Sequence, residues 1–92
     1  MSHTAKHKSK LIARVRRLQG QIEAIERSLV EEAPCGEILN LIASVRGAVT
    51  GLMAELIADH IREHISDPDQ DQNAIRAQGA AELIAVVRTY LK

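Results

Sequence analysis

Residues 11–29 read LIARVRRLQGQIEAIERSL, and the apolar side chains in this stretch recur at alternating intervals of four and three residues. This heptad spacing predicts an amphipathic helix that packs against another helix. The repeat consists of Leu11, Val15, Leu18, Ile22, Ile25 and Leu29. We expect the helix over about residues 5–32, because Pro34 steers the residue before it out of the helical region.

A second apolar stretch begins after Pro34, which suits the first turn of a new helix. Its apolar residues lie on more than one side of a helix expected over about residues 34–66, so one partner helix cannot cover them. A polar DPDQDQ linker then precedes a shorter helix expected over about residues 72–91. The sequence therefore predicts an all-α fold, a single 92-residue domain of three helices that associates with other copies of itself.

The formal net charge is zero, but the charges are unevenly distributed. Residues 1–22 hold six basic residues and no acidic one, whereas residues 23–92 hold six basic and all twelve acidic residues, giving net charges of +6 and −6. This asymmetry suggests that the N-terminal segment meets a polyanion, although acidic residues elsewhere in an assembly would also balance it. No apolar leader and no run of about 18 apolar residues is present, so we expect a cytoplasmic protein without a membrane segment.

The segment DHIREHIS, residues 59–66, places His60 and His64 on one helix face, close enough to bind one metal ion. The one cysteine, Cys35, lies in the first turn of the same predicted helix, where the helix dipole favours the thiolate. Histidines that only interact with the dipole, and a thiol that only packs, are the alternatives. Twenty-five residues of helix separate Cys35 from His60 by about 37 Å, so a shared site would need two chains.

An antiparallel pair of the second helices would bring the two ends together if they cross near residues 47–50. Gly47 and Gly51 lie there, and small residues four apart allow two helix backbones to approach closely, unless they serve local packing against the first helix. A hairpin bend at residue 33 would also place residue 3 beside residue 63. The expected ligands are Ser2 (through its α-amine if Met1 is removed), His3, His60 and His64 of one chain and Cys35 of the other, with His7 as a bystander.

A nitrogen-rich set that can expand to five or six ligands suits Ni(II) or Co(II), whereas a structural Zn(II) site is closed by four ligands. Glu63, between the two histidines, is a candidate to hydrogen-bond a metal ligand or to supply an extra oxygen ligand, and the alternative is an exposed helix carboxylate. On the first helix, Lys10, Arg14, Arg17 and Gln21 recur on one face, which we expect to point away from the apolar seam and to contact phosphates.

Three segments together resemble the CsoR/RcnR family of bacterial metal- and stress-responsive repressors over nearly the whole chain. They are RVRRLQGQIEAIERSL, the Pro34–Cys35 pair, and LIASVRGAVTGLMAELI with a histidine shortly after it. The resemblance implies a three-helix protomer, an antiparallel dimer that forms a four-helix bundle, and a disc-shaped homotetramer. It also implies metal ligands shared across the dimer interface and operator DNA as a partner, with Arg14, Arg17, Gln19 and Gln21 in the DNA-binding region.

Within that family, His3, Cys35, His60 and His64 resemble the nickel- and cobalt-sensing RcnR/DmeR-like type. The copper-sensing type would carry cysteine at position 64, and the persulfide-sensing type needs a second cysteine. The resemblance implies a repressor that releases operator DNA on binding Ni(II) or Co(II) and so controls metal efflux.

Four other functions remain open. A zinc-responsive member is one. A formaldehyde-responsive member would share Cys35 and His60 but carries proline at position 2, where this chain has Ser2. A purely structural helical oligomer would bind no metal tightly. An enzyme would use Cys35 as nucleophile and His60 as base.

Overall fold

The computed structural model describes residues 7–91, and within them it contains three helices and no strand. The helices are α2 (Lys8–Val30), α3 (Cys35–His64) and α4 (Ala74–Tyr90). Each lies inside one of the three ranges expected from the sequence. The all-α fold is therefore confirmed.

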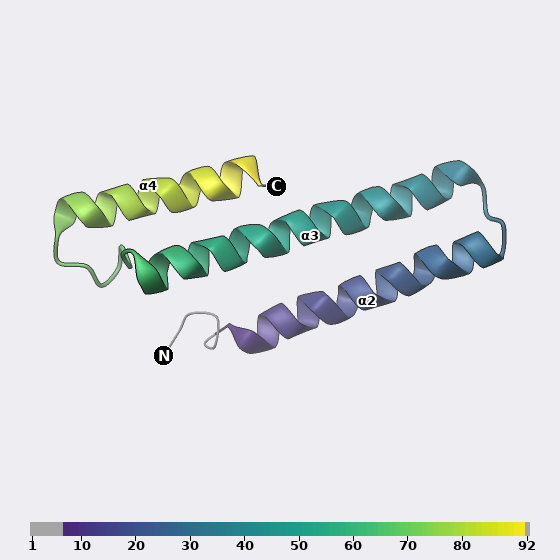
Figure 1. Cartoon of the computed structure of the whole chain (residues 1–92), viewed down its shortest axis with the longest axis horizontal. Helices are drawn as coiled ribbons and strands as arrows, with labels where there is room; N and C mark the ends of the chain where they lie inside the picture. The colour runs from purple at the N-terminus through teal and green to yellow at the C-terminus, as the bar shows by residue number, and fades with distance from the viewer. Residues whose placement is uncertain (1–6, 92) are drawn as a thin grey trace.

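The three helices lie side by side in one layer, with α2 and α4 on opposite sides of α3 (Figure 1). The Cα atoms span 57 × 25 × 13 Å, so the layer is about one helix thick. Within residues 7–91 both broad faces of the layer are consequently uncovered.

The turn between α2 and α3 is a Schellman motif. The Ala33 N–H donates to the Ser28 carbonyl at 2.9 Å, and the Glu32 N–H donates to the Leu29 carbonyl at 3.2 Å. Glu32 adopts the left-handed conformation with φ 56°, a position that usually holds glycine. Pro34 then directly precedes α3, which is the break that the sequence predicts.

The buried core is small and lies mainly between α3 and α4. Ala58 and Ile61 of α3 pack with Ala80 and Ile84 of α4, where the alanines allow the helices to approach closely. On α2, Leu18 is the buried residue. One chain thus hides little of its apolar surface.

The heptad seam of α2 divides into two rows. Leu18 is buried and Leu11 and Ile25 are partly buried, so this row faces inward. The other row consists of Val15, Ile22 and Leu29, which are 40%, 55% and 59% exposed. The prediction that this helix packs on another helix is confirmed, because α2 packs on α3, but among the described residues that contact covers only one row of the seam.

Helix α3 is long and apolar enough to cross a membrane by length and composition alone, a test that the central helix of a soluble helical protein also passes. In this fold it lies between α2 and α4 and carries a buried carboxylate, Asp59, which is 3% exposed. Contacts with α2 and α4 nevertheless cover little of its apolar surface, because only 11% of its most apolar stretch is buried.

The linker between α3 and α4 is organised by the carboxylate of Asp71. It accepts two hydrogen bonds from the Arg76 guanidinium at 2.6 and 2.8 Å, one from the Ser66 hydroxyl at 2.5 Å and one from the Asn73 N–H at 2.9 Å. These bonds, above all those from Arg76, hold the pKa of Asp71 well below its usual range, and Asp71 in turn raises the pKa of Arg76. The sequence alone predicts only a polar linker here.

Candidate functional site

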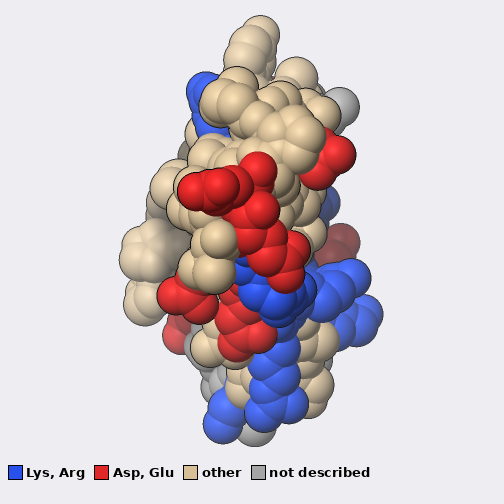
Figure 2. Space-filling model, turned by 90° about the vertical axis from the view of Figure 1, so that its right-hand side faces the viewer, with Lys and Arg blue, Asp and Glu red and all other residues tan. Residues whose placement is uncertain are grey.

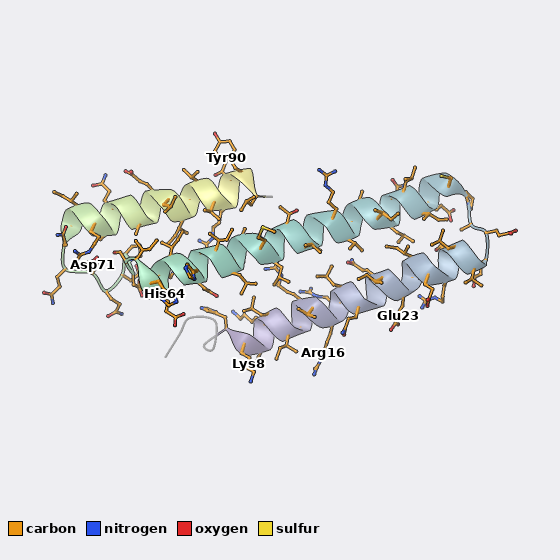
Figure 3. All side chains as sticks on the ribbon, in the orientation of Figure 1. Lys8, Arg16, Glu23, His64, Asp71 and Tyr90 are labelled. Carbon is orange, nitrogen blue, oxygen red and sulfur yellow. The ribbon has the colours of Figure 1, made fainter. Side chains whose placement is uncertain are left out.

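The histidine pair forms as the sequence predicts. His60 and His64 lie one turn apart near the end of α3, with ring centroids 4.5 Å apart and ring planes inclined at 41°. Both side chains are exposed, as is Glu63 between them. Figure 3 shows His64 at the end of α3 that lies beside the start of α2, marked by Lys8. The two imidazoles are therefore close enough to bind one metal ion from solvent.

The candidate thiol lies at the other end of the same helix. Cys35 is the first residue of α3, and its thiol is free and exposed. Because α3 is one continuous helix of 30 residues, it separates Cys35 from His60 by about 37 Å. Within residues 7–91 no group of three or more histidine, cysteine, aspartate or glutamate side chains could hold a metal ion. One chain therefore does not assemble the expected site from its described residues.

Ser2 and His3, the other expected ligands, lie outside the described residues. The register of the α2–α3 hairpin nevertheless follows from the residues of the two helices that line the same cavities. His7 lines a cavity of about 150 Å³ together with Glu55 and Asp59, and Leu18 lines another with Ala48. The start of α2 thus lies beside the part of α3 that leads into the histidine pair.

Asp59 is a charged residue of this region that sequence reasoning missed. Its side chain is buried, and the Arg62 guanidinium pairs with it at 3.2 Å. The spacing of an aspartate three residues before an arginine on a helix was the available signal. This pair lies on α3 directly beside His60.

The basic side chains gather on the first half of α2. Figure 2 looks onto the end where α2 meets α3 and shows most Lys and Arg in the lower half, where α2 lies in Figure 1. Lys8 and Arg16 point away from α3 (Figure 3). Lys10, Arg17 and Gln19 are also exposed.

Two members of the expected phosphate-binding face lie elsewhere. Arg14 and Gln21 are partly buried between α2 and α3, and they line a cavity of about 250 Å³ with Arg17, Leu18 and Ala48. The expectation that this face points away from the apolar seam is therefore wrong for Arg14 and Gln21. The reason is that α2 turns its Leu18 row toward α3, and Arg14 and Gln21 flank that row on the side opposite Val15 and Ile22.

An exposed stripe runs along α3 and connects the thiol to the imidazoles. Its residues follow at intervals of four and three: Cys35, Leu39, Ile42, Arg46, Val49, Met53, Leu56 and His60, and all of them are exposed. Val49, Met53, Leu56 and His60, with Leu52 and Ile57, line a shallow groove of about 460 Å³. The α3 stripe is a heptad seam with no partner helix within the described residues of one chain.

Comparison with known proteins gives the family. The family described as metal-sensitive transcriptional repressor matches residues 7–89 of this chain. The chain belongs to this CsoR/RcnR family of repressors. It is 47% identical over 92 residues, the full length of both chains, to an uncharacterised protein in the bioA 5′ region of Serratia marcescens. It is also 47% identical over 49 residues to a transcriptional repressor RcnR homolog from Escherichia coli O139:H28, covering 53% of this chain and 54% of that protein.

Membership of the repressor family settles the class of function. The family consists of repressors, so the hypothesis of a Cys35–His60 enzyme is dropped. A metal ion is the effector that the family description names, and a repressor acts by binding DNA. The donors on α3 fit a metal, because imidazole and thiolate are both good ligands for first-row transition metals.

Proposed function

We propose that this protein is a cytoplasmic repressor that binds operator DNA when metal-free and releases it on binding Ni(II) or Co(II), thereby controlling a metal-efflux gene. One observation carries the proposal: Cys35 and His60 lie at opposite ends of one exposed heptad stripe on α3. If a two-fold axis lies at the middle of that stripe, the Cys35 end of each chain lies beside the His60 end of the other. The dimer then contains two complete sites.

The stripe is symmetric in the way that such a dimer requires. In an antiparallel pair centred on Val49, Ile42 faces Leu56 of the partner subunit, and Leu39 lies within one residue of His60 of the partner subunit. The exposed apolar residues of α3 then cover one another, and α2 and α3 of two chains form a four-helix bundle. Two such dimers would form the disc-shaped homotetramer of the family.

In this dimer, Cys35 of the partner subunit would lie beside His60 and His64. These three residues, with His3 and the Ser2 amine, form the proposed ligand set, and Glu63, which is exposed between the two histidines, is proposed to hydrogen-bond a ligand. The excess of nitrogen donors and the capacity for five or six ligands favour Ni(II) or Co(II) over Zn(II). By linkage, metal binding and DNA binding must weaken each other by the same factor.

A subunit-mixing experiment tests the shared site. Cys35→Ala and His60→Ala should each abolish thiolate-to-metal charge-transfer absorption with Ni(II) or Co(II) under anaerobic conditions. When the two variants are unfolded and refolded together, each mixed dimer should regain one intact site, because one chain supplies the thiol and the other the imidazole. An absorption that never returns on mixing would contradict a site between subunits, and absence of tight binding by the wild type would favour a structural oligomer.

The metal titration also separates the related functions. Tight binding of Zn(II) with DNA release, and none with Ni(II) or Co(II), would identify a zinc-responsive member. DNA release by formaldehyde without metal would identify an aldehyde-responsive one. Either result would contradict the proposed effector and leave the family unchanged.

The DNA face is tested through Arg17, which is exposed on the basic half of α2. Arg17→Ala should weaken binding to DNA from upstream of its own coding sequence. The slope of log K against log salt should also fall by about 1 for each phosphate that the protein no longer neutralises. Arg27→Ala, at the other end of the same helix, is the control and should retain both values. Equal behaviour of the two variants would place the DNA elsewhere.

A further inference from the structure

Gly51 is the glycine whose missing side chain makes room for another residue. A Cβ atom built at Gly51 would lie 2.8 Å from Nη2 of Arg14, closer than such atoms approach in proteins. At Gly20, Gly36, Gly47 and Gly79 a Cβ would meet nothing within 4 Å. Arg14 of α2 therefore occupies the space over α3 that the glycine leaves open.

The Arg14 guanidinium lies against Gly51 but has no hydrogen-bond or ion-pair partner among the described residues. Among residues 7–91 none makes a hydrogen bond or an ion pair with the Arg14 side chain, whereas Arg62, Arg76 and Arg88 each pair with a carboxylate. Arg14 and Gln21 line the same cavity, and the Gln21 Oε1 atom is buried without a hydrogen-bond partner among the described residues. Its N–H donors thus remain available to an anionic oxygen such as a phosphate.

We propose that Gly51 is a positioning residue for DNA recognition, because it seats the Arg14 guanidinium against α3. The proposal rests on the proposed function and on the expectation from the sequence that Arg14, like Arg17 on the same helix, contacts DNA phosphates. Helix α3 is continuous and also carries Cys35, His60 and His64. A displacement of α3 along α2 on metal binding would therefore move Gly51 relative to Arg14. The Arg14 side chain would then be presented to DNA in a different position.

The variant Gly51→Ala tests this contact with one added methyl group. Alanine favours helix more than glycine does, and the atom it would displace is the end of a flexible side chain, so the fold is expected to be retained. Metal-free DNA affinity should fall about three- to tenfold, the effect of having to order one long side chain on binding. The ratio of metal-free to metal-loaded affinity should shrink as well.

Two comparisons make the result specific to Arg14. Arg14→Ala and the double variant Arg14→Ala/Gly51→Ala should bind DNA equally, because Gly51 acts only through Arg14. Gly79→Ala on α4, where an added Cβ also meets nothing within 4 Å, should bind DNA as the wild type does. Sedimentation velocity should give the same assembly for all variants.

The outcomes separate this inference from the proposed function. The inference would be overturned if Gly51→Ala bound DNA and responded to metal as the wild type does. It would also be overturned if Gly51→Ala lowered DNA affinity equally in the wild-type and Arg14→Ala backgrounds. Wild-type DNA binding that ignores metal would contradict the proposed function, while a loss in Gly51→Ala that depends on Arg14 would still support the positioning role.

Discussion

A single carboxylate, Asp71, fixes the connection between α3 and α4. Four hydrogen bonds from Ser66, Asn73 and Arg76 converge on its two oxygens, and its side chain is 9% exposed. Asn73 completes the arrangement by accepting the Arg76 N–H at 3.0 Å, which caps α4. The angle at which α4 returns along α3 therefore depends on one ionised side chain.

This dependence predicts a pH effect on stability. The pKa of Asp71 is lowered in the folded state, so its contribution is present above the ordinary aspartate pKa of about 3.9 and is lost as the pH falls below that value. Asp71→Asn should lower the melting temperature at pH 7, and its difference from the wild type should shrink below about pH 4. Asp69→Asn, in the same linker but exposed, is the control and should follow the wild-type profile. A constant difference down to about pH 2.5 would show that the charge of Asp71 is not responsible.

At the scale of the helices, the end of α2 is built with a strained residue. The Schellman motif needs a left-handed conformation at Glu32, where a Cβ atom costs free energy that glycine avoids. Glu31, one residue earlier, has φ −81° and an ordinary right-handed conformation. The hairpin between α2 and α3 thus forms despite the unfavourable backbone conformation of Glu32.

Replacing that residue should stabilise the protein. Glu32→Gly should raise the free energy of unfolding by up to about 1 kcal/mol, because the relief of strain is partly offset by the greater freedom of glycine in the unfolded chain. Glu31→Gly gains no such relief and should lower stability or leave it unchanged. Urea unfolding followed by circular dichroism measures both, and a loss of stability in Glu32→Gly would contradict the strain at this position.

The whole molecule is a layer one helix thick with apolar residues on its surface. Domains usually bury their apolar faces between two packed layers, whereas here Leu39, Val49 and Met53 of α3 are 59%, 44% and 50% exposed. The α2 row of Val15, Ile22 and Leu29 is exposed as well. A repressor of this shape needs further copies of itself to complete its core.

A charge at the centre of the α3 stripe tests that requirement. Val49→Asp would place two carboxylates together across the proposed two-fold axis, so the protein should dissociate and lose helicity at concentrations where the wild type is assembled. Ser44→Asp adds the same charge on an exposed position of α3 outside the stripe and should leave the assembly intact. Sedimentation velocity measures the oligomeric state of both variants. An assembled Val49→Asp protein would show that the interface does not include this stripe.

The positions of the helices, and of Cys35, His60 and His64 along α3, could be predicted from the sequence. Apolar periodicity locates a helix, Pro34 locates a break, and a spacing of four residues brings His60 and His64 together, because each of these effects acts between near neighbours in the chain. The separation of Cys35 from the histidines followed from the rise of the helix alone.

Only the tertiary structure decided which side of each helix faces inward. Periodicity gives the spacing of apolar residues, but the partner helix determines which row it covers, so Leu18 is buried while Val15 and Ile22 are exposed. The same packing placed Arg14 between the helices and over Gly51, where the sequence had left open a second copy of α3 or local packing with the first helix. It also buried Asp59. These features arise between residues far apart in the chain, and their physical cause is the rotation of α2 and α3 about their own axes, which local spacing does not fix.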